Sequence, residues 1–595
     1  MTYSAPVADI SFTLKHITGL AKGLEEGRFG DLSDDLVDAI LEEAGKFAAE
    51  EIAPLNRIGD TVGARFVDGA VTMPGNWKEV YRHWSEAGWG SISGPVDYGG
   101  QGLPLMMQMA TQEMWHSASM AFGLGPTLTN GAIEALSAHA SDALKDIYLA
   151  RLISGEWMAT MNLTEPQAGS DLNALRARAE PVGDGTYRIF GQKIFISYGE
   201  HDLSDNIVHL VLARLPDAPA GTRGISLFLV PKFFVNDDGS LGARNDAKCA
   251  SIEHKLGIHA SPTCTMVYGE EGGAIGWLIG EENRGLACMF TMMNNARLTV
   301  GIEGVAVAEG AFQKALSFAE ERLQGRAPGA TGASMSPIVE HPDVRRNLMI
   351  MKAQTRAARA ICYACAHAID MAHTSEADEK SFWQERANLI TPIAKAYSTD
   401  IGFEVSALGV MVHGGMGYVE ETGAAQYLRD ARITAIYEGT NGIQAIDLVT
   451  RKLPQSGGEA VRGYIAELAA IAEEARAFNR EDFHGLGDSL TESLADLTEA
   501  TEWMLTALQE GRVPEALAGA TPYLRLFGLA VGGSYLAKGA LAAAHQATGA
   551  AAAAAHIHVA RFFAETVIVE TAGLKRAVMR GGHTVLAANA ALLAS

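Results

Sequence analysis

The sequence predicts an α+β protein that is mostly helical, with one block of strands between helical blocks. From Leu36 to Ile153, apolar residues recur every three or four positions, which is the period of a helix packed on one face. At Trp157 the period changes to two, as in strands whose side chains alternate between faces. Helical periodicity returns at Leu286. A chain of 595 residues is too long for a single core, so the blocks predict separate domains.

The composition excludes some classes of protein. Hydrophobic residues make up 48% and charged residues 20%, as in soluble globular proteins. The net charge of −23 disfavours a protein that grips nucleic-acid phosphates, although a nucleotide ligand could still bind to a few local cations and helix N-termini. The five cysteines are odd in number and sparse, which fits a reducing compartment. With no signal-peptide pattern and no run of 18 uncharged apolar residues, we expect a cytoplasmic protein with neither a membrane span nor a nucleic-acid partner.

The first two segments are an extension and a helical domain. Residues 1–35 carry weak structural signals and are interpreted as an N-terminal extension. Residues 36–156 form the predicted N-terminal helical domain. Glycine and proline in Gly88–Gly102 predict a turn-rich loop, and Phe122–Pro126 predicts a second break before a further helix.

Residues 157–285 form the predicted β domain. Trp157–Leu163 has the pattern of a strand, and Thr164–Asp171 that of a loop. Leu175–Val182 and Thr186–Ser197 flank the turn Gly183-Asp-Gly185 and predict a hairpin. Further strands are expected at Ile207–Leu215, Gly224–Pro231, His254–Tyr268 and Gly276–Gly280. Together they are consistent with a small barrel.

The remaining residues are predicted to be helical. Residues 286–453 contain four expected helices, at Met289–Glu321, Pro342–His373, Phe382–Gly409 and Gly442–Leu453. The Pro- and Gly-containing stretch Leu453–Gly458 is interpreted as a linker. Residues 459–595 are rich in alanine and form an extra C-terminal helical domain.

The stretch around Glu438 is the strongest candidate for chemistry. This lone carboxylate follows Tyr437, precedes Gly439 and is flanked by the apolar residues Ile433, Ile436 and Ile443. Desolvation penalises a charged carboxylate, so Glu438 should be a stronger base than a surface glutamate. Gly439, having no Cβ, lets a ligand approach the backbone. The alternative is a helix end with Gly439 as C-cap and Thr440 or Asn441 as the next N-cap, and the spacing alone favours it.

Two motifs in the β domain carry hydroxyl groups. The loop that follows Met161 contains Thr164, which could bond a flavin edge, and Ser170, which could meet an acyl carrier; the alternative is ordinary turn chemistry. In Gly191–Ser197, strand alternation places Lys193, Phe195 and Ser197 on one face. An aromatic ring and a nearby hydroxyl suit a flavin, and a half-buried structural strand is an equally good interpretation.

Two arginines and a glycine cluster are weaker candidates. Arg297 and Arg322 have no acidic residue three or four positions away, so a same-helix ion pair does not explain them. Each could meet phosphate or lie on a solvated helix face. The cluster Val412–Tyr418 could approach an adenine or pyrophosphate. Cys362-Tyr-Ala-Cys365 and His556-Ile-His558 have no second pair of ligands nearby, so no metal is expected there.

Taken in order, these motifs resemble those of the acyl-CoA dehydrogenase family over residues Val37–Leu453. The matching segments are Thr164-Glu-Pro-Gln-Ala-Gly-Ser-Asp171, Gly191-Gln-Lys-Ile-Phe-Ile-Ser197, Lys255-Leu-Gly-Ile-His-Ala-Ser-Pro-Thr263, Arg322-Leu-Gln324, Gly414-Gly-Met-Gly417, Arg429-Asp-Ala-Arg-Ile433 and Ile436-Tyr-Glu-Gly-Thr440. The resemblance implies an N-terminal helical domain, a middle β-barrel and a C-terminal four-helix bundle.

The resemblance also implies roles for individual residues. Glu438 would be the catalytic base. The residues implied at FAD are Met161, Thr164, Phe195 and Ser197 at the flavin, Gly414 and Gly415 at the adenosine end, Thr440 near the phosphates, and Arg322 and Gln324 reaching the FAD of a neighbouring subunit. The residues implied at the acyl-CoA are Ser170, Arg297, Tyr437 and Gly439. The chain departs from the family pattern in two places: Phe195 replaces the commoner Trp, and no Phe precedes Gly325.

The implied reaction is FAD-dependent α,β-dehydrogenation of an acyl-CoA to a trans-2-enoyl-CoA, with an electron-transferring flavoprotein as electron acceptor and a homodimer as the assembly. The length of the chain and the sequence of Phe195–His209 look most like those of the long bacterial branch that includes 3-methylmercaptopropionyl-CoA dehydrogenases. That branch implies 3-methylthiopropanoyl-CoA, from dimethylsulfoniopropionate (DMSP) breakdown, as substrate. The alternatives are a short-, medium- or long-chain acyl-CoA dehydrogenase of fatty acid β-oxidation, a DNA-associated alkylation-response relative, and an inactive scaffold.

Overall fold

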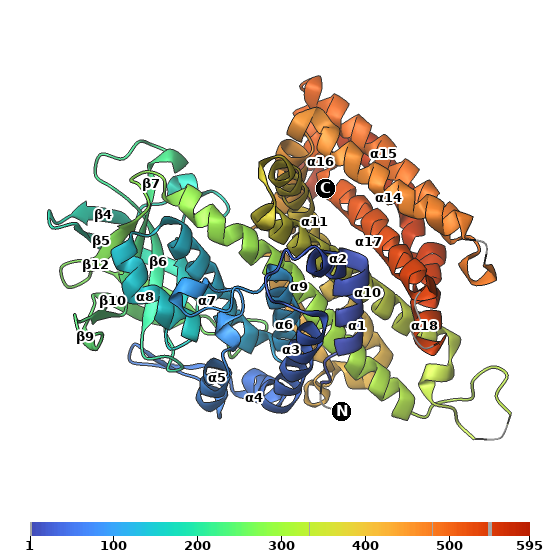
Figure 1. The fold of residues 1–595 in the computed structure, drawn as a ribbon, viewed down its shortest axis with the longest axis horizontal. Helices are drawn as coiled ribbons and strands as arrows, with labels where there is room; N and C mark the ends of the chain where they lie inside the picture. The colour runs from blue at the N-terminus through green and yellow to red at the C-terminus, as the bar shows by residue number, and fades with distance from the viewer. Residues whose placement is uncertain (1–2, 332–333, 479, 546–549) are drawn as a thin grey trace. The chain divides into compact units, whose positions relative to one another are not determined.

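The computed structural model describes residues 3–331, 334–478, 480–545 and 550–595. Contacts divide the chain into two compact units, which are described separately (Figure 1). The first contains Tyr3–Gly45 and Arg297–Ser595, and the second contains Lys46–Ala296. The long helix α9, Gly285–Glu321, passes from the second unit into the first.

The second unit is built around a barrel. Its main sheet consists of β3 Met158–Asn162, β4 Arg178–Pro181, β5 Thr186–Ser197, β6 Ile207–Arg214, β7 Ile225–Pro231, β10 Ala247–Ile252, β11 Thr263–Tyr268 and β12 Ala274–Ile279. β5, β12, β7 and β6 are neighbours in that order, and β4 pairs with both β5 and β6, which closes a ring of strands. The predicted hairpin of β4 and β5 is confirmed by their antiparallel pairing. The predicted strand at His254–Tyr268 is shorter, and β10 was not predicted.

Besides the strands, the second unit contains helices. They are α4 Ala53–Val62, α5 Trp77–Glu86, α6 Leu105–Ala118, α7 Met120–His139 and α8 Asp142–Ser154. α7 and α8 share one core with the strands, and Figure 1 shows both helices beside β6.

The predicted helix break at Phe122–Pro126 is wrong, because α7 runs through Pro126. The chain breaks earlier, at Ser119, whose φ of −157° is extended. The glycines in this segment allow close packing instead of a turn. A Cβ on Gly123 would lie 2.5 Å from Nδ1 of His116, and one on Gly125 would lie 2.6 Å from Cε of Met158.

The first unit is helical. Besides residues 297–321 of α9, it contains α10 Pro342–Thr374, α11 Ala377–His413, α12 Ala424–Ala431, α13 Asn441–Asp447, α14 Glu459–Ala477, α15 Leu486–Gln509, α16 Val513–Ala518, α17 Ala520–His545, α18 Ala550–Phe562 and α19 Thr571–Arg580. α9 and α11 cross at paired glycines. A Cβ on Gly304 would lie 2.4 Å from the Ser398 carbonyl oxygen, and one on Gly402 would lie 2.6 Å from the Gly304 carbonyl oxygen. The backbones of these two helices therefore lie in contact, so side chains that flank the crossing on α9 and on α11 lie close together.

The sequence suggested a weakly structured N-terminal extension, but the structure shows helices there. The extension forms α1 Val7–Phe12, a π-helix at Thr13–Thr18 and α2 Leu20–Glu25. Long-range contacts that no local pattern encodes hold it on the first unit. Nε of Arg356 lies 2.9 Å from Oδ2 of Asp9, and Nζ of Lys538 donates to the Ile17 carbonyl over 2.6 Å.

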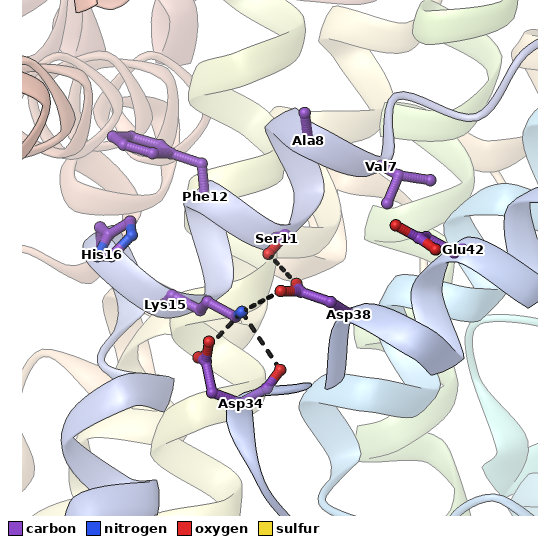
Figure 2. Close-up of a pocket in the computed structure, with 9 residues that line it drawn as sticks. All are labelled: Val7, Ala8, Ser11, Phe12, Lys15, His16, Asp34, Asp38 and Glu42. Atoms are coloured by element: carbon purple, nitrogen blue, oxygen red, sulfur yellow. Dashed lines mark hydrogen bonds and ion pairs between the residues drawn. The ribbon is translucent and has the colours of Figure 1, made fainter. Parts of the chain in front are cut away.

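The N-terminal extension also borders a polar pocket. Figure 2 shows the Lys15 ammonium between Asp34 and Asp38, 2.9 Å and 2.8 Å from their carboxylates, with Ser11 bonded to Asp38. The Lys15 side chain is only 8% exposed, so this cluster anchors the extension to the start of α3, Asp34–Phe47. None of the site residues predicted from the sequence lines this pocket.

Two stretches are long and apolar enough to span a membrane, Ala520–His545 and residues 551–580. In α17, 89% of the apolar window is buried inside the protein, as expected for a core helix. In the second stretch the buried share is 39%. Length and composition alone are weak evidence for a membrane span.

Candidate functional site

Glu438 occupies a strained turn between two helical segments of the first unit. Its φ is +55°, in the left-handed region, and Gly439 follows with φ +84°. A residue with a Cβ is destabilised there by about 1–2 kcal/mol, so the surrounding structure must hold it. Such outliers cluster at functional sites. The helix-end interpretation is correct for Thr440, the N-cap of α13, whose hydroxyl accepts from the Ile443 N–H over 3.2 Å.

The side chain of Glu438 is half-buried beside two cations. Burial raises the pKa of its carboxyl, and the charges of Arg297 and Lys395 oppose that rise. A Cβ built on Gly439 would lie 4.0 Å from Nη2 of Arg297, so the guanidinium borders the same turn. Glu438 is therefore a stronger base than an exposed glutamate, because burial outweighs the two cations in their effect on its pKa.

Arg297 has an acidic partner that the sequence did not reveal. Its Nη1 lies 3.8 Å from Oδ2 of Asp447, on α13, while its buried Nε has no hydrogen-bond partner within the part of the chain that the structure describes. Arg297 is therefore neither on a solvated helix face nor fully satisfied by the protein.

Lys395, Asn441 and Gln444 hold the turn and were not identified from the sequence. Nζ of Lys395 donates to Oδ1 of Asn441 over 2.8 Å, and Nδ2 of Asn441 donates to Asp400 over 2.7 Å. Nε2 of Gln444 lies 3.3 Å and 3.4 Å from the carbonyl oxygens of Glu438 and Gly439. One signal was available: Lys395 is the only charged residue between Arg386 and Asp400 in the sequence.

In the second unit, Phe195 and its neighbours depart from a regular strand. Phe195 has φ +60° and its side chain is 59% exposed, whereas Lys193 is fully buried. The expectation that Lys193, Phe195 and Ser197 share one face is therefore wrong. The pairing register with β11 shifts between Lys193 and Ile196, so a bulge interrupts the alternation. The bulge presents an aromatic ring to the outside.

Thr164 lies next to this bulge. Its carbonyl oxygen accepts from the Ile194 N–H over 2.9 Å, which joins the predicted flavin loop to β5. Ser197 is paired with Thr263 on β11. Within the described ranges, the hydroxyls of Thr164 and Ser197 make no hydrogen bond to the protein, so both are free to bond a ligand.

A buried ion pair supports the loop that carries Thr164. Nζ of Lys193 lies 2.8 Å from Oε1 of Glu165, with the two side chains 0% and 3% exposed. The Glu165 carboxylate also accepts from the backbone N–H groups of Arg176 and Ala177 over 2.7 Å and 3.0 Å. Burial alone raises the pKa of Glu165, but Lys193 and these N–H groups outweigh it and keep the carboxyl ionised. The sequence suggested no role for this pair.

The other predicted residues divide between the two units. Met161 is buried on β3 and Ser170 is exposed in the loop of the second unit. In the first unit, Arg322 and Gln324 bond each other over 3.2 Å on an exposed segment after α9. Gly414 and Gly415 end α11 as exposed residues, and a Cβ on either would meet no atom within 4 Å, so the backbone is open to a ligand there.

Family models match four consecutive parts of the chain. These are the acyl-CoA dehydrogenase N-terminal domain at residues 35–156, the middle domain at 160–270, the C-terminal domain at 283–453, and a model described as acetyl-CoA dehydrogenase C-terminal like at 464–589.

Relatives match over all or most of their length. The chain is 45% identical over 593 residues to a 3-methylmercaptopropionyl-CoA dehydrogenase of Ruegeria pomeroyi, covering 99% of this chain and 100% of that protein. It is 38% identical over 478 residues to a butyryl-CoA dehydrogenase of Syntrophomonas wolfei subsp. wolfei, covering 78% of each.

Solved structures share the fold. One is Caenorhabditis elegans ACDH-11 in complex with C11-CoA, with a TM-score of 0.76 at 21% identity, covering 97% of this chain and 95% of that one. Another is an acyl-CoA dehydrogenase from Bacillus anthracis complexed with FAD, with a TM-score of 0.73 at 19% identity, covering 95% and 90%. The matches in sequence and in fold agree, and the chain belongs to the acyl-CoA dehydrogenase family.

Proposed function

We propose that the protein removes hydrogen from the α and β carbons of an acyl-CoA, with FAD as cofactor and Glu438 as the base. The observation that carries the proposal is the geometry of Glu438, a half-buried carboxylate on a left-handed turn beside Arg297 and Lys395. Tyr437 and Gly439 flank it and would line the thioester site. Ser170, in the loop that follows β3 in the second unit, would contact the CoA chain.

Each unit, taken by itself, contains residues that would suit a part of FAD. In the second unit, the exposed aromatic ring of Phe195 and the free hydroxyls of Thr164 and Ser197 would match the face and polar edge of a flavin, and Met161 on β3 is the fourth proposed flavin residue. In the first unit, the open backbone at Gly414 and Gly415 suits the adenosine end, and Thr440 at a helix N-terminus suits phosphate. The cofactor would supply a hydride acceptor.

The protein groups would perform the proton chemistry. The α-proton of a saturated thioester is weakly acidic, so its removal needs a positioned base and donors that stabilise charge on the thioester oxygen. The Glu438 carboxylate would take the proton as the β-hydrogen leaves as hydride. The backbone N–H of Glu438 would be one donor to that oxygen. The product is a trans-2-enoyl-CoA.

For the substrate, we propose 3-methylthiopropanoyl-CoA, an intermediate of DMSP breakdown. The full-length 45% identity to the Ruegeria pomeroyi enzyme supports this choice, and the 38% identity to a butyryl-CoA dehydrogenase supports short-chain acyl-CoA as the alternative. An electron-transferring flavoprotein is the proposed electron acceptor, and the proposed location is the cytoplasm.

The substrate assignment is tested with a panel of acyl-CoA thioesters. We expect kcat/KM for 3-methylthiopropanoyl-CoA to exceed that for butyryl-CoA by about 10-fold, since one substituent in an apolar pocket changes specificity by ~10- to 200-fold. The measurement is steady-state dye reduction with methylthiopropanoyl-, butyryl-, octanoyl- and palmitoyl-CoA. A preference for palmitoyl-CoA would contradict the short thioether substrate and leave the reaction type intact.

We also propose a homodimer. Arg322 and Gln324 lie together on an exposed segment, where they could reach a cofactor in a second subunit, and two-fold dimers are the commonest closed assembly. Light scattering at micromolar concentration should give twice the mass of the 595-residue chain. A monomer that retains FAD and activity would contradict the shared site, whereas a tetramer would still allow it.

A further inference from the structure

Glu303 is a buried carboxyl beside the proposed base that has no role in the proposed chemistry. It lies on α9 with 0% of its surface exposed. Its Oε2 accepts a short hydrogen bond from the Tyr437 hydroxyl. Its Oε1 has no hydrogen-bond partner within the residues that the structure describes. A buried carboxyl with an unsatisfied oxygen destabilises a fold unless something compensates for it, so its place next to Tyr437 needs an explanation.

The turn that carries Glu438 must be held from both sides, because a left-handed glutamate does not stay in place by itself. On the C-terminal side, Gln444 bonds the carbonyl oxygens of Glu438 and Gly439, and Lys395 bonds Asn441. On the N-terminal side, the Tyr437 hydroxyl donates a hydrogen bond to Glu303. α9 thus holds one side of the turn, and α11 and α13 hold the other.

Glu303 is suited to this contact in its neutral form. Burial raises the pKa of its carboxyl to about 8; the charge of Glu438 adds to the rise, and the Tyr437 bond and Lys395 oppose it. A neutral acid accepts the tyrosine hydroxyl without placing a second negative charge beside the base. A charged carboxylate there would repel both Glu438 and the negative charge that develops on the thioester.

We propose that Glu303 is a positioning residue, which through the Tyr437 hydroxyl fixes the turn that presents Glu438 to the substrate. This inference rests on the proposed function, in which Glu438 is the base. It assigns Glu303 no proton transfer with substrate. The amide of Glu303→Gln can still accept from Tyr437, whereas Glu303→Ala and Tyr437→Phe each remove the contact.

The test uses full-length, FAD-loaded protein and the rate of flavin bleaching after anaerobic mixing with saturating acyl-CoA. Glu303→Ala and Tyr437→Phe should each lower the limiting rate by about 10- to 100-fold, the size of effect that a displaced catalytic group produces. In Glu303→Ala the apparent substrate dissociation constant should change by less than about threefold, because the buried Glu303 side chain is not proposed to contact substrate. Glu303→Gln should keep at least about a third of the rate. The double variant Glu303→Ala/Tyr437→Phe should be no slower than the slower single variant, because both changes remove one interaction.

Glu309 supplies the matched control. It lies on the same helix, is also buried, and bonds Arg359 over 2.9 Å. Glu309→Ala should lower the melting temperature and leave the bleaching rate within about twofold of wild type, since the hydrogen bonds of Glu309 are to Arg359 and Gln313 and not to the turn of Glu438. A rate loss in Glu309→Ala equal to that in Glu303→Ala would mean general destabilisation and would overturn the inference. If Glu303→Ala gives no soluble holoenzyme, the single variants Tyr437→Phe and Glu303→Gln are compared with each other instead, because the first removes the contact and the second keeps it.

Three further results would reject the positioning role. These are a wild-type rate in Glu303→Ala, multiplicative losses in the double variant, and a Glu303→Gln enzyme that fails to bleach, which would make Glu303 a proton acceptor. Each is distinguishable from failure of the proposed function, in which Glu438→Gln itself would stay active.

Discussion

Glu438→Gln should abolish turnover while leaving both FAD and acyl-CoA bound. The amide keeps the size of the side chain and its hydrogen-bonding capacity, but it cannot take the α-proton. The rate of flavin bleaching by saturating acyl-CoA should therefore fall by at least ~10²- to 10⁴-fold, the contribution of a positioned general base. The measurement is anaerobic stopped-flow absorbance of the flavin, with bound FAD counted before mixing.

Glu303→Gln is the matched comparison, because it makes the same substitution at the other carboxyl of the site. The two variants should separate clearly, with Glu303→Gln bleaching and Glu438→Gln not bleaching. Bleaching in Glu438→Gln with none in Glu303→Gln would transfer the role of base to α9. The burial of Glu303, whose pKa is about 8, makes this comparison necessary, because a buried carboxyl near neutral pKa is also a plausible base.

The sequence predicted the elements whose signals are local. Changes in the spacing of apolar residues along the sequence located the barrel between the helical segments. The turn Gly183-Asp-Gly185 correctly predicted the β4–β5 hairpin. Motif order pointed to Glu438, and the structure adds the strained backbone that marks it. The alternative interpretation, with Thr440 or Asn441 as an N-cap, holds for Thr440, and it was available from the sequence because capping depends on residues only three positions apart.

The sequence could not predict features that depend on distant contacts. Gly123 and Gly125 suggested a loop because local pattern does not distinguish a glycine that turns from one that allows close packing. The N-terminal helices depend on partners such as Arg356, 347 positions from Asp9. The link from Glu303 to Tyr437 spans 134 positions and two helical segments, so no spacing rule could suggest it.

Lys193→Met should lower both stability and FAD retention. Removing one partner of a buried ion pair leaves the other charge uncompensated and typically lowers the free energy of unfolding by about 3–5 kcal/mol. Here the remaining charge is Glu165, 3% exposed, which would keep only its N–H donors. Lys193 also donates to the Leu163 carbonyl over 3.1 Å, so the variant releases the chain on both sides of Thr164.

The measurements are urea unfolding and the fraction of FAD retained after gel filtration, each against Arg178→Met. Arg178 pairs with Glu180 over 2.9 Å, but the two side chains are 60% and 47% exposed. An exposed pair contributes about 0–1 kcal/mol, so the control should unfold like wild type and keep its FAD. If Lys193→Met loses stability but retains FAD at the control level, the pair is structural only. A loss of FAD that excess FAD reverses, with the bleaching rate restored, would show that the pair holds the Thr164 loop in position to bind the flavin.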